Sequence, residues 1–139
     1  MRVSSASATD KGLRRSTNED CVSVRADLSL FVVADGMGGH AAGEVASQAA
    51  VDGIEAFVEA TRAISPDQTW PMPFDPTQST NANRLRTGFQ MGNRRLADQI
   101  LASSKLKGMA TTAVAVLIDG DTATVAHVGD SRLYRLRDG

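Results

Sequence analysis

Apolar residues recur at helical spacing in two stretches of the chain. In Ala42–Arg62 the small and apolar residues fall on one stripe, and most charged residues lie off it. Asn83–Ser103 repeats this pattern and predicts a second helix. Gly88 and Gly92 lie within it, where each glycine costs about 1 kcal/mol relative to alanine. Close packing against another helix is the structural reason that would account for both.

Shorter runs rich in β-branched residues predict strands on either side of the helices. In one of them, Leu30–Ala34 is continuously apolar, as expected of a strand buried on both faces. Asp119-Gly120 separates two others and predicts a hairpin turn. The predicted strands are Val3–Thr9 at an edge, Asp20–Ala26, Ser29–Ala34, Thr111–Ile118, Thr122–Val128 and Ser131–Arg137.

The order of these elements predicts the fold class. Strands, two helices and further strands favour an α+β layered domain with an antiparallel sheet over a doubly wound parallel one. Residues 65–83 hold all four prolines and predict a loop, which Trp70 and Phe74 would pin to the body. A length of 139 residues suits one folding unit. The chain stops at Asp138-Gly139, a turn signal after a predicted strand, so we expect it to end within a hairpin.

The composition gives expectations about the compartment and the partners of the protein, but few about its reaction. The chain is 42% hydrophobic and 22% charged, as ordinary globular proteins are. Its net charge of −1 gives no reason to expect a nucleic acid or an anionic membrane as partner. Cys21 is the single cysteine, so no intrachain disulfide forms, and a small buried residue is its expected role. The chain shows no signal peptide or transmembrane run, so we expect a cytoplasmic protein.

Acidic residues recur at the ends of the apolar strands. Glu19 and Asp20 lie at the start of one strand, Asp35 follows the next, and Asp130 follows a later one. Each alone has an ordinary explanation in a turn or at a solvated strand end. Together in one cleft, the carboxylates would repel one another unless a cation neutralised them. Oxygen ligands without nitrogen or sulfur suit hard cations such as Mg²⁺ or Mn²⁺.

The glycine-rich loop after the apolar strand allows a second interpretation. Residues 36–41 fit the G-x-G-x-x-A pattern of dinucleotide-binding domains. Asp35 would then place a carboxylate beside the pyrophosphate, which is unfavourable. The expected second strand ending in an acid is also missing, because Glu55 and Glu59 lie in the predicted helix. Dinucleotide binding therefore remains a minor alternative.

Four segments together resemble the type 2C (PPM) protein phosphatases in their bacterial form, in the order found in that family. They span nearly the whole chain, which makes a chance match a poor explanation. The segments are residues 9–20 (TDKGLRRSTNED), residues 35–47 (DGMGGHAAGEVAS), residues 108–112 (GMATT) and residues 128–134 (VGDSRLY).

The resemblance implies a β-sandwich of mainly antiparallel sheets flanked by helices, with a two-metal centre at one edge. By position, Asp35 would bridge two Mn²⁺ or Mg²⁺ ions, and the Gly36 carbonyl would contact one of them. Glu19 would bind through water, with Asp20 beside it. Asp130 matches the ligand of a third, looser metal site.

The resemblance also implies the substrate and the residues that handle it. The substrates would be phosphoserine and phosphothreonine in proteins, so that the enzyme opposes a cellular kinase, and a water activated by the two ions would attack phosphorus. Arg15 has the spacing of the arginine that holds the phosphate, with Arg14 the weaker alternative. His40 is the candidate general acid, although many relatives place a histidine where this chain has Met37. Thr112 matches a threonine near the site.

The family's later motifs, with two further aspartate ligands, would lie beyond Gly139. We therefore interpret residues 1–139 as the N-terminal portion of one phosphatase domain, and expect the chain alone to bind Mn²⁺ poorly and turn over little. The alternative from another functional class is a catalytically incomplete fragment that binds a partner through an unpaired sheet edge.

Overall fold

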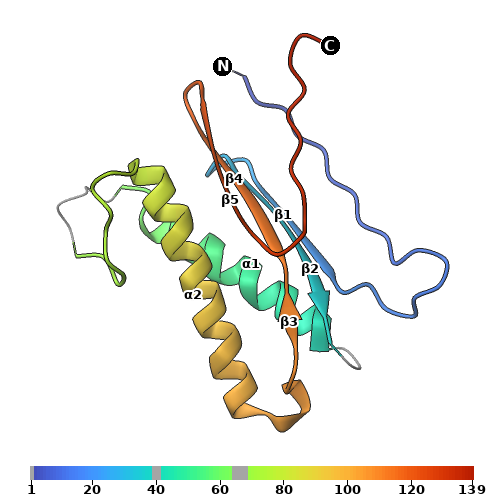
Figure 1. Cartoon of the computed structure of the whole chain (residues 1–139). Helices are drawn as coiled ribbons and strands as arrows, with labels where there is room; N and C mark the ends of the chain where they lie inside the picture. Colours follow the sequence, from blue (N-terminus) through green and yellow to red (C-terminus); the bar gives the residue numbers. More distant parts are fainter. Residues whose placement is uncertain (1, 39–41, 64–68) are drawn as a thin grey trace.

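The structure, a computed structural model, describes residues 2–38, 42–63 and 69–139. Two helices pack on one side of an antiparallel sheet, and the extended N-terminal segment runs along the other side (Figure 1). The elements are β1 (Asp20–Arg25), β2 (Leu30–Met37), α1 (Ala42–Ala60), α2 (Thr80–Ala102), a short 3₁₀ helix η1 (Ser104–Leu106), β3 (Ala110–Thr111), β4 (Ala113–Asp119) and β5 (Thr122–Val128).

The sheet confirms the α+β prediction. Its strands run in the order β1-β2-β4-β5, with the short β3 pairing the end of β2, and each of these pairings is antiparallel. A dinucleotide-binding fingerprint requires a parallel βαβ unit. The antiparallel partners of β2 therefore contradict that alternative.

The core lies between the sheet and the two helices. Along β2, Leu30, Val32 and Ala34 point to the helices and are at most 1% exposed, while Phe31 and Val33 point the other way. The main apolar cluster also includes Val51, Ile54 and Val58 of α1, Leu85 of α2, and Leu28, Ala113, Ala115 and Leu117. Burying each large side chain contributes about 1.5–3 kcal/mol, so this face supplies most of the stability.

The two helices approach each other at their glycines. A Cβ atom on Gly53 of α1 would lie 2.5 Å from the Cα atom of Gly92 on α2. A Cβ atom on Gly92 would lie 2.9 Å from the carbonyl oxygen of Ala50. Gly88 also faces α1, near Ile54. Close helix packing is thus confirmed as the reason for Gly88 and Gly92.

The opposite face of the sheet is apolar, and neither α1 nor α2 packs on it. Val24, Val33 and Val125 lie on it and are 39–44% exposed. The N-terminal segment crosses this face, where Ala6–Thr9 line a groove with β1 and β2. In Figure 1 the C-terminal segment after β5 runs on the same side.

The terminal segments are where the strand predictions were wrong. Val3–Thr9 and Ser131–Arg137 form no strand, and β3 and β4 divide the predicted strand 111–118 at Thr112. Within the described part of the chain, neither terminal segment exchanges backbone hydrogen bonds with a neighbour. An extended segment becomes a strand only when a partner pairs with it, and local composition does not supply that partner.

The helices and the loop between them agree closely with expectation. Helix α2 begins three residues early because Ser79 caps it, its Oγ accepting a hydrogen bond from the Ala82 amide at 3.1 Å. Trp70 packs between Phe57 of α1 and Phe74, with ring centroids 5.5 and 5.2 Å apart. The prediction that Trp70 and Phe74 pin the loop is confirmed. Neither described helix is long and apolar enough to cross a membrane.

Candidate metal centre

Two carboxylates face each other at the end of the β1–β2 pair. Asp20 is the cross-strand neighbour of Asp35, on the face of the sheet that the helices leave free. Burial raises the pKa of Asp20, and the nearby Asp35 and Glu19 raise it further. A bound cation would remove this penalty by stabilising the ionised form.

Helix α1 packs tightly behind this pair. A Cβ atom on Gly36 would lie 2.0 Å from the carbonyl oxygen of Gly43 and 2.6 Å from that of Glu19. A Cβ atom on Gly43 would meet the Glu19 carboxylate at 2.6–2.7 Å. The buried Ser47 hydroxyl donates to the Glu19 carbonyl oxygen at 2.7 Å, and the Gly36 amide donates to the same oxygen at 3.1 Å. These contacts fix the backbone of two predicted ligands, Glu19 and Gly36.

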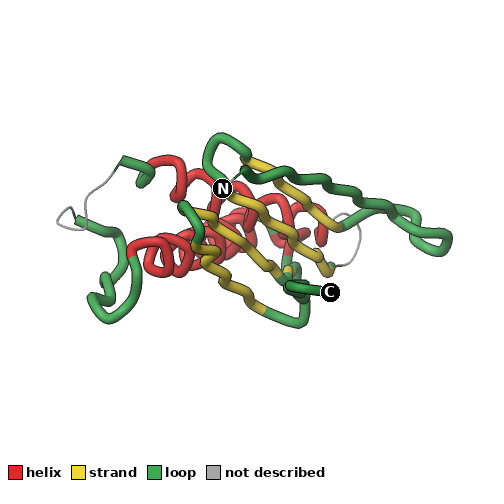
Figure 2. The backbone as a smooth tube through the Cα atoms, turned by 90° about the horizontal axis from the view of Figure 1, so that it is seen from above, coloured by secondary structure: helices red, strands yellow, loops and turns green. Residues whose placement is uncertain are grey.

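A loop before β1 brings an arginine close to these two carboxylates. Residues 10–17 project beyond the strand ends in both views (Figures 1 and 2). The Asp10 carboxylate accepts a hydrogen bond from the Gly12 amide at 2.7 Å, where Gly12 has a φ of 73°. Asn18 closes the loop by donating to the Thr9 hydroxyl at 2.8 Å and accepting from the Asp20 amide at 3.1 Å.

The loop and the carboxylates enclose one polar cavity of about 130 Å³. Of the two neighbouring arginines, Arg15 lines it and Arg14 does not. Lys11 also lines it, and the sequence interpretation gave this residue no role. The cavity is lined by Asp10, Lys11, Arg15, Thr17, Asn18, Glu19, Asp20, Asp35 and Gly36.

Asp130 is held differently from the other predicted ligands. It is exposed, follows β5 and does not line this cavity. Its neighbour Ser131 is hydrogen bonded through its hydroxyl to that of Thr112. The Thr112 amide in turn donates to the Asp35 carbonyl oxygen at 2.9 Å. Asp130 therefore belongs to the same end of the sheet, through Thr112.

The donor atoms suit a hard cation, but the ligand set is incomplete. Glu19, Asp20 and Asp35 offer only oxygen, as Mg²⁺ and Mn²⁺ prefer. Within residues 2–38, 42–63 and 69–139, no three His, Cys, Asp or Glu side chains are arranged to hold a metal ion. Further oxygen ligands are thus needed for a closed site. His40, the predicted general acid, lies outside the described residues.

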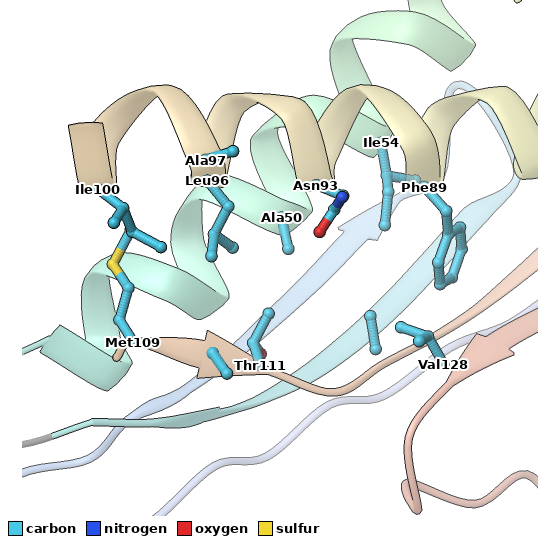
Figure 3. A pocket seen from close by; sticks show the side chains of 12 residues that line it. Ala50, Ile54, Phe89, Asn93, Leu96, Ala97, Ile100, Met109, Thr111 and Val128 are labelled. Atoms are coloured by element: carbon cyan, nitrogen blue, oxygen red, sulfur yellow. The ribbon is translucent and has the colours of Figure 1, made fainter. Parts of the chain in front are cut away.

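The remaining candidates for chemistry lie elsewhere. Burial raises the pKa of the Cys21 thiol, which donates to the Gln48 side-chain carbonyl at 3.4 Å, so a nucleophilic role is unsupported. His127 lies on β5, away from the polar cavity. A larger cavity of about 270 Å³ lies between α2 and the sheet (Figure 3). Its lining includes no titratable side chain, so it is unsuited to metal or proton chemistry.

Comparison with known proteins identifies the group to which these features belong. The model of the family described as protein phosphatase 2C matches residues 12–139. The serine/threonine protein phosphatase PstP of Mycobacterium tuberculosis is 41% identical over 134 residues, which cover 96% of this chain and 23% of that protein. The serine/threonine phosphatase stp of Listeria welshimeri is 35% identical, covering 94% of this chain and 48% of that protein.

Solved structures show the same similarity. The catalytic domain of PstP, determined in complex with two manganese ions, has a TM-score of 0.68 and 35% identity to this chain. The match covers 88% of this chain and 46% of that domain. The chain thus spans less than half of the length of each of these relatives.

Proposed function

The chain belongs to the protein phosphatase 2C family, and from that premise we propose that it forms the N-terminal portion of one domain that hydrolyses phosphoserine and phosphothreonine in proteins. The observation that carries this proposal is the polar cavity at the strand ends. It combines paired carboxylates, which bind divalent cations, with an arginine that binds phosphate.

The placement of the carboxylates supports a metal role for them. Asp35 and Asp20 would hold Mn²⁺ or Mg²⁺, with Glu19 and the Gly36 carbonyl behind them and Asp130 at a looser third position. The complex of PstP with two manganese ions supports a two-metal arrangement. Two bound ions would supply a water nucleophile at neutral pH and would stabilise the charge of an in-line displacement.

The other residues of the cavity would bind and orient the phosphate. The Arg15 guanidinium offers two parallel N–H donors to the non-bridging phosphate oxygens. Lys11 adds a second positive charge at the same cavity. The leaving alkoxide requires a proton, and His40 remains the predicted donor. Because the cavity lies at the rim of the sheet, the reacting phosphate can enter while its peptide stays outside.

The free face of the sheet supports an incomplete domain. The exposed valines on this face, Val24, Val33 and Val125, are expected to be covered when the domain is whole. The relatives' greater length is consistent with further strands and ligands beyond Gly139. Partners would be phosphoproteins of the cytoplasm, modified by a serine/threonine kinase.

The test compares two lengths of polypeptide on a phosphothreonine peptide with and without Mn²⁺. The chain extended past Gly139 to the length of its relatives should hydrolyse the peptide only with Mn²⁺, and the 139-residue chain should be far weaker. Asp35→Asn in the longer protein should abolish the metal-dependent rate, while Asp27→Asn, in the exposed β1–β2 turn, should leave it unchanged. Metal-independent hydrolysis, or full activity of Asp35→Asn, would refute the proposal.

A further inference from the structure

The side-chain hydroxyl of Thr112 takes the place of its backbone carbonyl as a hydrogen-bond acceptor in the pairing with β2. The ladders of β2 with β3 and with β4 share one register, which places Thr112 opposite Asp35. In such an antiparallel pair, the two residues normally exchange both backbone hydrogen bonds. Here the Thr112 amide donates to the Asp35 carbonyl oxygen at 2.9 Å, but the Asp35 amide donates to the Thr112 hydroxyl at 3.3 Å.

Thr111 completes the exchange at this point. Its hydroxyl lies 2.7 Å from the Thr112 carbonyl oxygen and 2.9 Å from the Asp35 carbonyl oxygen. The Thr112 carbonyl oxygen, which does not accept from the Asp35 amide, therefore accepts from the Thr111 hydroxyl instead. Two adjacent threonine hydroxyls thus satisfy the backbone opposite Asp35, the predicted bridging ligand, near the end of β2.

The same Thr112 side chain contacts both residues that flank Asp130. Its hydroxyl is hydrogen bonded to the Ser131 hydroxyl. Its methyl group lies against Gly129, where an added Cβ atom would be 2.6 Å from Thr112 Cγ2. Gly129 has a φ of 87°, a conformation that favours glycine. Thr112 is 6% exposed, so these contacts are shielded from water.

We propose that Thr111, Thr112 and Ser131 form a hydroxyl bridge that positions Asp35 and Asp130 relative to each other for metal binding. None of the three is a metal ligand or a catalytic residue in this proposal. They are positioning residues, and their value lies in setting the distance between carboxylates on β2 and after β5. This inference rests on the proposed function for its metal, but the bridge itself is defined by the contacts above.

The central test removes the Thr112 hydroxyl while keeping its shape. Thr112→Val should weaken Mn²⁺ binding about 10–100-fold, the usual loss when a group that orients a ligand is removed. Thr112→Ser keeps the hydroxyl and should restore most of the affinity. Titration calorimetry on the chain extended past Gly139 measures both. Thr124→Val on β5 is the matched control, because it removes a hydroxyl outside this network and should leave Mn²⁺ affinity unchanged.

Kinetics of the same variants separate positioning from general damage. Thr112→Val should raise the Mn²⁺ concentration for half-maximal rate, with kcat recovering towards the parent value at saturating Mn²⁺. Ser131→Ala, at a half-buried position, provides a second variant if Thr112→Val folds poorly, and should lose less affinity. Equal Mn²⁺ affinity in Thr112→Val and the parent, or no recovery in Thr112→Ser, would overturn the proposal.

Amide hydrogen exchange tests the bridge without metal. In the metal-free protein, the Asp35 amide should exchange at least about fivefold faster in Thr112→Val than in Thr112→Ser, because its acceptor is gone. If the parent shows no Mn²⁺ binding at all, the proposed metal site is wrong, and the exchange result alone decides on the bridge. Unchanged protection of the Asp35 amide would then refute it.

Discussion

Asp35 and Asp130 lie at the same end of the sheet, Asp35 near the end of β2 and Asp130 after β5, but the surrounding chain holds them in different ways. Asp35 sits beside Gly36, whose backbone is in close contact with α1 and with Glu19. Asp130 lies in an exposed turn that touches the rest of the site through Thr112. The comparison suggests that helix packing fixes the half of the site around Asp35, whereas side-chain hydroxyls fix the half around Asp130.

Glycine substitutions give the largest expected difference between the two halves. Gly36→Ala should lower the free energy of unfolding by about 3 kcal/mol, because its Cβ atom would strike backbone atoms that cannot rotate away. Gly129→Ala adds the backbone penalty of its φ of 87°, but it should still cost less than Gly36→Ala, because its obstacle is the Thr112 side chain rather than backbone. Urea unfolding monitored by circular dichroism measures both.

The control for these variants is Gly12→Ala. Gly12 also has a positive φ, but nothing lies within 4 Å of its added Cβ atom, so only the backbone penalty of about 1–2 kcal/mol applies. A Gly36→Ala protein as stable as Gly12→Ala would show that helix α1 does not fix this half of the site.

Neutralising one carboxylate in each half of the site should weaken Mn²⁺ binding by different amounts. Asp35→Asn should weaken Mn²⁺ binding by at least about 100-fold, equal to about 2.7 kcal/mol, because a direct ligand should matter at least as much as the groups that orient it. Asp130→Asn should cost about tenfold, because Asp130 does not line the polar cavity. Calorimetry on the extended chain gives both values. Equal losses would remove the distinction between the two halves.

The Ser47 hydroxyl tests the contact between α1 and Glu19. Ser47→Ala should lower the free energy of unfolding by about 1 kcal/mol, the net value of one buried hydrogen bond. The loss stays modest because the Glu19 carbonyl keeps its bond from the Gly36 amide. Ser104→Ala, at an exposed position, should change stability by less than about 0.5 kcal/mol. Indistinguishable variants would mean that this hydrogen bond adds no stability.

The site could be predicted from the sequence only in part. Carboxylates at strand ends were visible from local patterns, whereas Arg15 was predicted only from the resemblance to the family. The structure gathers Arg15, Asp20 and Asp35 around one cavity. The roles of Ser47 and Thr111 were not predicted, because each depends on a partner 28 or 76 residues away in the chain. A small hydroxyl residue carries no local sign of such a partner.

The fold shows the same division between local and distant information. Helical periodicity located α1 and α2, and the apolar run located β2, because each signal is contained in the element itself. The glycines of α2 pointed correctly to close packing, although only the structure shows Gly53 opposite Gly92. Val3–Thr9 failed as a strand because pairing depends on another segment.

Asp20→Asn should give the smallest effect, with a sign that depends on metal. Burial and the neighbouring Asp35 raise the pKa of Asp20 in the folded protein, so its contribution to stability is present below the unfolded pKa and is lost as pH rises through the folded pKa. In metal-free protein at pH 7, Asp20→Asn should therefore stabilise the fold, by no more than about 0.5 kcal/mol because the side chain is largely exposed. At pH 3 both proteins carry a neutral group and should unfold at nearly the same urea concentration.

Saturating Mn²⁺ should reverse the order of stability of the parent and Asp20→Asn at pH 7, since the parent has a metal ligand that the variant lacks. If Mn²⁺ stabilised both proteins equally, Asp20 would not belong to the metal site, and the comparison would rest on Asp35 and Asp130 alone.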